Sequence, residues 1–438
     1  MLVVISLKLI KDKKMKTITK VMFLLVIFLI VHPSCTKDEP IGGELVEEEG
    51  VIVSVPHLWK RNLHKNNQPS SNSIIDAHLV YNGNPVIATT EGNGDRWINL
   101  IDINTGQDVW KWNDIYEAPT EKFSIRRTHF YNNLMTYQVG SRSYCINLDN
   151  GTTYWKKRHN RSFNVKISGL DENVFLFGEP NDTLQEYDTY VGNEMNINTG
   201  EINEFLYTDI DFNSGGEGNR VTWVFHIEPF RHTDGKIYLM VVSHDHFPNW
   251  YINQFVGLYN YTNREWVYNR KMISEGNNTG TNYMVIRNDK AYMTSGHSMN
   301  CVDIWTGERL WRKEIQGSIS FSSFIVEEGK VIGQDEAMNV YCWNAETGSL
   351  QWQTDGAGTS SRLRYLNGIV YFSGGSTSKI HAIDISTGKT VWLLKPELIE
   401  EDATDFKPDI YAIEGENGEK GKIVVCTPMN AYCLEAYQ

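Results

Sequence analysis

Residues 303–311 read DIWTGERLW, and this stretch decides the fold. It predicts a strand that ends in a Thr-Gly turn, followed by a return strand with a tryptophan four residues after the glycine. Glycine takes positive φ without a Cβ clash, and a neighbouring Thr or Asp can close the turn with side-chain-to-backbone hydrogen bonds. The stretch therefore indicates a structural β-hairpin and carries no evident chemistry.

The same turn recurs along the chain at spacings of 40 to 63 residues. Alternating apolar runs before and after each turn leave room for four short strands per interval, which is typical of propeller blades. The seven turns are Thr105-Gly106, Asn150-Gly151, Thr199-Gly200, Thr262-Asn263, Thr306-Gly307, Thr347-Gly348 and Thr387-Gly388. In the fourth, asparagine replaces glycine as the next best residue for positive φ.

A tryptophan follows most of these turns and is expected to pack one blade onto the next, because an indole buries a large flat surface. Glu204 takes this position in the third unit. The predicted blade-docking residues are Trp59, Trp110, Trp155, Trp266, Trp311, Trp352 and Trp392.

The two ends of the repeat region complement each other. Residues 53–60 supply a lone outer strand, and the chain ends in 432–435, a third strand with no fourth strand after it. Pairing the two closes the ring and hides both strand edges. We therefore predict an all-β fold over 51–438, an eight-bladed β-propeller of four-stranded antiparallel blades closed by the N-terminal strand. Seven blades is the alternative if the irregular region 160–275 holds fewer sheets.

The repeat resembles that of the quinoprotein-type (PQQ-like) propeller family, Ala-x-Asp-x-x-Thr-Gly-x-x-x-Trp. The match is strong in five units and weak in the third and fourth. The family includes propeller lipoproteins of outer-membrane barrel assembly, and this resemblance implies a non-catalytic scaffold. Fold alone does not settle function.

The N-terminal segment 1–34 reads as a lipoprotein signal peptide, with lysines before the apolar run Val21–Val31 and Met15 as a plausible true start. Cys35 follows a small residue and is the predicted lipidation site, and 35–50 reads as a flexible tether. Lys37-Asp38-Glu39 resembles a surface-export signal. We expect an outer-membrane lipoprotein that faces the periplasm or the cell surface.

The net charge of the chain limits the kinds of partner that it can bind. The chain carries a formal −13, and segment 1–34 carries +5, so the remainder carries −18. An acidic body argues against nucleic acid as a partner. We expect a monomer, held at the membrane by its lipid, with a protein or a glycan as its ligand.

The cysteines do not predict redox chemistry. Cys145, Cys301, Cys342 and Cys433 all lie six residues before a turn position, where small packed residues are expected. Cys426 and Cys433 flank one hairpin, and a disulfide between them is left open. The sequence has no adjacent cysteine pair and no Cys-x-x-Cys-His motif, so a quinone-dependent dehydrogenase is disfavoured. We expect no cofactor.

Polar residues gather in the fourth unit. His244 and His246 are two apart and would share one face of a strand, as metal ligands often do. The alternative, hydrogen-bonding surface histidines, is preferred, and we expect no metal. The cluster comprises His226, Glu228, His232, His244, Asp245 and His246.

The repeats are interrupted by insertions at 178–191, 207–219, 243–253 and 271–281, all on one face of units three and four. Such insertions usually mark the binding side of a repeat fold. Exposed aromatic residues beside acids suit a protein or a sugar. A polysaccharide-active enzyme, lyase-like, is the alternative function, and drift in tolerant loops is the alternative to any function. The candidate binding face comprises Tyr187, Tyr190, His244, His246, Phe247, Trp250 and Tyr251.

Overall fold

The computed structural model describes residues 51, 55–64, 74–91, 95–116, 128–139, 141–159, 168–178, 191–206, 221–247, 251–277, 283–317, 319, 324–356, 358, 361–374, 377–416 and 418–437. Cys35, the predicted signal peptide and the predicted tether lie outside these residues. No helix within the described ranges has the length and apolar character needed to cross a membrane.

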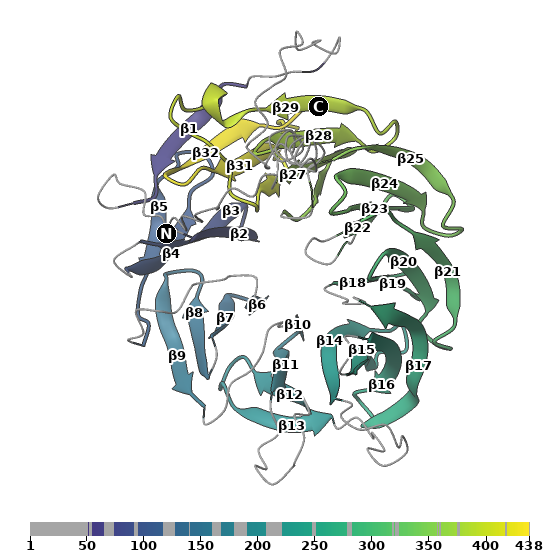
Figure 1. The fold of residues 1–438 in the computed structure, drawn as a ribbon. Helices are drawn as coiled ribbons and strands as arrows, with labels where there is room; N and C mark the ends of the chain where they lie inside the picture. The colour runs from purple at the N-terminus through teal and green to yellow at the C-terminus, as the bar shows by residue number, and fades with distance from the viewer. Residues whose placement is uncertain are drawn as a thin grey trace, which may run out of the picture. The chain divides into compact units, whose positions relative to one another are not determined.

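In the described residues, thirty-two strands form eight four-stranded antiparallel sheets, which Figure 1 shows arranged in a ring. Blades 1 to 4 comprise β2 (Ile74–Tyr81), β3 (Asn84–Thr90), β4 (Arg96–Ile101), β5 (Asp108–Trp112); β6 (Thr128–Tyr131), β7 (Leu134–Val139), β8 (Arg142–Asn147), β9 (Thr152–Arg158); β10 (Ser168–Leu170), β11 (Asn173–Gly178), β12 (Val191–Asn196), β13 (Ile202–Leu206); and β14 (Val221–Arg231), β15 (Ile237–His246), β16 (Tyr251–Asn260), β17 (Glu265–Asn277).

Blades 5 to 8 continue the same order. They comprise β18 (Met284–Arg287), β19 (Lys290–Ser295), β20 (Ser298–Asp303), β21 (Arg309–Glu314); β22 (Phe324–Glu327), β23 (Lys330–Gln334), β24 (Asn339–Asn344), β25 (Leu350–Asp355); β26 (Arg364–Leu366), β27 (Ile369–Ser373), β28 (Ile380–Asp384), β29 (Thr390–Leu394); and β30 (Tyr411–Ile413), β31 (Lys422–Cys426), β32 (Asn430–Glu435) with β1 (His57–Asn62).

The N-terminal strand closes the ring. β1 pairs antiparallel with β32, with Trp59 opposite Cys433 and Asn62 opposite Asn430. The first and last described strands thus share blade 8, where β1 covers the edge of β32 and forms the outer strand of the sheet. The prediction of eight blades is confirmed, and the seven-bladed alternative is wrong because 160–275 holds two complete sheets.

The apolar core is divided among the blade joints. Within the described residues there are eight buried clusters, and each joins two neighbouring blades. Trp59, for example, packs with Ile101 of blade 1, while Trp110 packs with Leu148 of blade 2. The eight joints therefore form a closed series, and the stability of each blade depends on the next.

The repeated turn and tryptophan build these joints together. In five joints the indole lies over the turn glycine of the next blade, where an added Cβ would come within 2.6 to 2.9 Å of the ring. The same indole Nε1 donates a hydrogen bond to the backbone carbonyl three residues before that glycine, at 2.6 to 3.0 Å. The five tryptophans are Trp59, Trp110, Trp155, Trp311 and Trp352.

The C–D turn of blade 4, between β16 and β17, lies one residue later than the sequence predicts. Arg264, not Asn263, has the positive φ of the turn, at +57°. Counting four residues from Arg264 gives Tyr268, whose hydroxyl donates to Ile304 O at 2.9 Å and whose ring lies over Gly307. The prediction that Trp266 docks blade 4 onto blade 5 is wrong, because its ring instead packs within its own blade over Gly257.

The five cysteines within the described residues are all buried and all free. Cys433 pairs in register with Val424 and not with Cys426, so the disulfide left open by the sequence does not form. Burial raises the pKa of each thiol to about 12, as at Cys145 and Cys342. These side chains act as small packed groups.

Trp392 differs from the other docking tryptophans. Its indole is 1% exposed, yet its Nε1 has no hydrogen-bond partner among the described residues. Trp311→Phe is expected to cost about 1 kcal/mol more free energy of unfolding than Trp392→Phe, because only Trp311 loses a hydrogen bond. Urea unfolding of both variants measures this difference. Equal costs would show that the hydrogen bond at the joint contributes nothing.

A long connection between β29 and β30 fastens the closing blade. It includes the 3-10 helix η2 (Pro396–Leu398) and carries Glu400. The Glu400 carboxylate accepts hydrogen bonds from Lys60 Nζ at 3.0 Å, Asn430 Nδ2 at 2.8 Å and Tyr432 OH at 2.7 Å. It therefore ties β1 to β32 at the ring closure. The sequence analysis predicts insertions only in units three and four, so this connection is an additional one.

Glu400→Gln is expected to lower the free energy of unfolding by about 1–2 kcal/mol at neutral pH, because these hydrogen bonds reach a charged acceptor. Partial burial opposes ionisation, but the bonds from Tyr432, Asn430 and Lys60 outweigh it and hold the pKa of Glu400 below its usual value. This contribution is full above the pKa of the unfolded state and is lost as pH falls through the folded value. Urea unfolding of the parent and the Glu400→Gln protein at neutral and acidic pH measures the loss of stability and its dependence on pH.

The matched control for this change is Glu401→Gln, at an exposed neighbour on the same connection. It should leave stability unchanged. A Glu400→Gln protein as stable as the parent at neutral pH would contradict the closure role.

Candidate functional site

Blade 4 is built differently from its neighbours. Its strands have 10 to 13 residues, whereas the strands of the other blades have three to eight. The extra length lies at the β15–β16 hairpin and at the far end of β17. At about 3.3 Å per residue, five extra residues extend the sheet by roughly 15 Å. We call residues 243–247, 251–255 and 270–277 the blade-4 extension. The sequence predicts loops at 243–253 and 271–281, whereas the structure forms 243–246, 251–253 and 271–277 as strands.

Buried polar contacts brace the blade-4 extension. Asp245 and Arg270 form an ion pair of 2.8 Å with side chains only 3% and 17% exposed. The Arg270 guanidinium also lies 4.1 Å from the centre of the Phe255 ring. A buried ion pair is tolerated only with good geometry and further contacts, and the pair fixes β15 and β17 across the strand between them.

The other contacts reach blade 5. Gln254 Nε2 donates to Thr294 O at 3.4 Å, and Ser274 Oγ donates to Gln254 Oε1 at 3.4 Å. Ser295 Oγ donates in turn to Ser274 Oγ. All four side chains are buried. The extension is therefore joined to its neighbour through a polar seam.

The candidate aromatic residues fall into three groups. Tyr187, Tyr190 and Trp250 lie outside the described residues, as does the side chain of His246. Phe247 and Tyr251 flank the hairpin tip, and their rings meet edge to face at 6.0 Å. The third group is His244 alone.

His244 was expected at the surface and is instead fully buried. Its ring stacks on Phe225, with centroids 4.6 Å apart and an interplanar angle of 16°. This contact arises because β15 continues past residue 243 and turns the histidine inward, next to β14. His244 therefore contributes to the core of the extension and not to an exposed binding face.

The polar residues weighed as metal ligands do not converge. His226 Nε2 lies 3.0 Å from Glu228 Oε2, and His232 Nδ1 lies 3.3 Å from Asp234 Oδ1. Within the ranges that the structure describes, no group of three or more His, Cys, Asp or Glu residues is placed to hold a metal ion. Each of these two histidines contacts one carboxylate.

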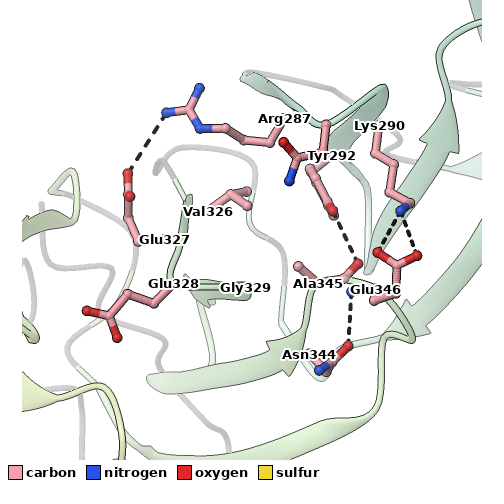
Figure 2. Close-up of a pocket in the computed structure, with 11 residues that line it drawn as sticks. Arg287, Lys290, Tyr292, Val326, Glu327, Glu328, Gly329, Asn344, Ala345 and Glu346 are labelled. Carbon is pink, nitrogen blue, oxygen red and sulfur yellow. Dashed lines mark hydrogen bonds and ion pairs between the residues drawn. The ribbon is translucent and has the colours of Figure 1, made fainter.

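A second feature lies between blades 5 and 6, on the face that carries the short turns. It is a polar cavity of about 390 Å³, shown in Figure 2. Lys290 Nζ reaches both Glu346 carboxylate oxygens at 2.7 and 2.6 Å, while Arg287 lies 4.0 Å from Glu327. Its lining residues are Arg287, Asn288, Lys290, Tyr292, Val326, Glu327, Glu328, Gly329, Asn344, Ala345 and Glu346.

Comparison with known proteins supports the repeat type. Residues 270–354 and 295–402 match the family described as "Outer membrane protein assembly factor BamB", PQQ_2. These are PQQ-like propeller repeats. The matched segments cover blades 5 to 7, where the turn and its tryptophan are most regular. No curated protein matches the chain.

Solved structures share the propeller fold at low sequence identity. Sqt1 of Saccharomyces cerevisiae is 8% identical with a TM-score of 0.60, covering 88% of this chain and all of that one. The computationally designed Ika8 protein is 12% identical with a TM-score of 0.55 and the same coverage. A europium-containing methanol dehydrogenase is 11% identical with a TM-score of 0.56, covering 85% and 84%. At these identities the comparisons show a shared propeller fold.

Sequence reasoning missed the cavity, because its lining comes from three separate stretches of the chain, 287–292, 326–329 and 344–346.

Proposed function

We propose that this protein is a non-catalytic, lipid-anchored scaffold outside the cytoplasm that binds a protein partner through the blade-4 extension. The observation that carries the proposal is the extension itself, a braced sheet that prolongs blade 4 among the described blades. It presents Phe247 and Tyr251 beside its hairpin tip and Met272 on β17 opposite Phe255. Met272 is 57% exposed. Braced aromatic and apolar side chains suit a partner surface because little conformational entropy is lost on binding.

Three further observations support this function. The family matched by residues 270–402 is named for outer-membrane protein assembly. The acidic body disfavours nucleic acid. The signal-like segment before Cys35 fits export and anchoring at the outer membrane, with the propeller in the periplasm or at the cell surface.

Photocrosslinking from the extension tests the partner. A photoreactive amino acid at position 272 should capture a specific membrane-associated protein. The same amino acid at position 310, an equally accessible site on the outer strand of blade 5, is the control and should not capture it. Phe247→Ala with Tyr251→Ala should abolish the capture, whereas Phe130→Ala with Tyr154→Ala in blade 2 should leave it intact. Capture unaffected by the blade-4 changes would overturn the proposal, as would binding to a glycan array that depends on these residues.

The anchor has its own test. Cys35→Ser, or globomycin treatment of cells, is expected to move the protein from the membrane fraction to the soluble fraction. An unchanged membrane fraction under both treatments would show that the protein is held by some other means.

A further inference from the structure

The hairpin between β23 and β24 of blade 6 ends in an exposed methionine whose backbone is left-handed. Met338 has φ of +63°. Asp335 N–H donates to Asn339 O at 3.0 Å and Met338 N–H donates to Asp335 O at 3.2 Å, so residues 336–338 form a three-residue hairpin loop. Glycine or asparagine is favoured at the last position of such a loop, because a larger side chain crowds the neighbouring carbonyl.

Neither the turn geometry nor burial accounts for a methionine at this position. Among the described residues, eleven other than glycine have positive φ, and six of them are Asn or Asp. Met338 is the one among these eleven with an apolar side chain, and that side chain is 46% exposed. Residues held in unfavourable backbone conformations by the surrounding structure cluster at functional sites.

A buried carboxylate braces the loop that presents this methionine. Asp335 is 0% exposed. Its carboxylate accepts hydrogen bonds from the N–H groups of Gly317 and Asn339, both at 2.9 Å, and from Tyr341 OH at 3.1 Å. A buried charge is tolerated only with such bonds, and here they fix both ends of the hairpin loop. Met338 is therefore presented by a rigid segment.

The position of this hairpin in the ring relates it to the blade-4 extension. It joins the second and third strands of blade 6, as the β15–β16 hairpin does in blade 4. Because each blade repeats the same strand order, the two hairpins lie on the same face of the ring, two blades apart (Figure 1). Glu336 and Ala337, which precede Met338, are exposed as well. The face that carries Phe247 and Tyr251 thus presents a further apolar side chain beside an acid.

We infer that Met338 is a second anchor for the protein partner of the blade-4 extension and enters an apolar pocket of that partner. This inference rests on the proposed function. Methionine is unbranched and polarisable, so it fills irregular apolar pockets and makes favourable contacts with aromatic rings. The braced hairpin loses little conformational entropy on binding. Exposed Glu336 beside it favours a partner pocket with a basic rim.

The test combines photocrosslinking and unfolding of the full-length chain. Met338→Asn is expected to lower the capture of the partner from position 272 about five-fold, since an apolar contact is lost. The midpoint of its urea unfolding should be equal to or above that of the parent, because asparagine tolerates the left-handed conformation. In the parent, a photoreactive amino acid at position 337 should capture the same protein as one at position 272.

Two controls match this substitution. Ser378→Asn makes the same change at a left-handed residue, with φ of +54°, in the corresponding hairpin of blade 7. Leu350→Asn removes an apolar side chain that is 54% exposed on the outer strand of blade 6. Both variants should leave the capture from position 272 unchanged.

Three results would overturn the second anchor while the proposed function stands. Met338→Asn could leave the capture from position 272 unchanged. It could lower the urea midpoint, which would assign Met338 a structural role. Position 337 could capture a different protein, or none, while position 272 captures its partner. If position 272 captures no protein, the proposed function itself fails and the second anchor fails with it.

Discussion

Gly388→Ala is expected to lower the free energy of unfolding by about 3 kcal/mol, because the change combines two costs. Gly388 has φ of +72°, where an L side chain costs about 1–2 kcal/mol. Its added Cβ would also lie 2.6 Å from Cδ2 of Trp352, which docks on it from blade 6. Forcing a methyl group into a packed site costs typically about 1–3 kcal/mol. Urea unfolding of the two proteins measures the sum.

The same blade supplies a control that separates the two costs. Gly368 has φ of +79°, but a Cβ there would meet nothing within 4 Å. Gly368→Ala should therefore cost only the backbone part. In a Trp352→Ala background, Gly388→Ala should fall to the cost of Gly368→Ala, since the clash is gone. Equal costs at Gly388 and Gly368 in the parent protein would contradict the view that the turn glycine exists to receive the indole.

The blade count could be predicted because the turn and its tryptophan are local signals with a fixed spacing. The error at blade 4 shows where this local reasoning stops. Arg264 adopts positive φ in place of glycine, and tertiary contacts stabilise it there. Its guanidinium lies 3.0 Å from Glu194 of blade 3 and 4.0 Å from the centre of the Tyr261 ring. The sequence alone does not show that tertiary contacts stabilise positive φ at an arginine. The sequence-based prediction therefore places the turn one residue early and gives Trp266 as the docking residue.

The candidate site was harder to predict than the fold. The insertion in unit four was visible, but its polar residues concealed the continuing strand, so His244 was expected in a loop. Burial of His244 follows from its partner Phe225 on the neighbouring strand. The cavity between blades 5 and 6 is lined by residues 287–292 of one blade and 326–329 and 344–346 of the next. No local sequence pattern brings these three stretches together.

Acid is expected to destabilise the protein through His381 in blade 7. Its ring stacks on Phe372 with centroids 4.9 Å apart, and its Nε2 lies 3.1 Å from Thr377 Oγ1. Burial lowers the pKa of His381 to about 4, and the charge of Lys379 adds to the effect. The folded state therefore binds this proton less readily than the unfolded state, whose histidine pKa is about 6.5.

The sign of the pH dependence follows directly. Above a pH of about 6.5 the histidine is neutral in both the folded and the unfolded state, so its protonation does not change the free energy of unfolding. As pH falls from there toward 4, the histidine of the unfolded state binds a proton while His381 of the folded state stays neutral. The free energy of unfolding therefore drops by about 3 kcal/mol. His381→Gln keeps a polar group for Thr377 but does not titrate, so it should remove this part of the acid sensitivity. His57→Gln, at an exposed histidine of β1, is the control and should retain it. Urea unfolding at pH values spanning this range measures both. If the His381→Gln protein loses as much stability as the parent over that range, buried His381 is not the group that acid protonates on unfolding.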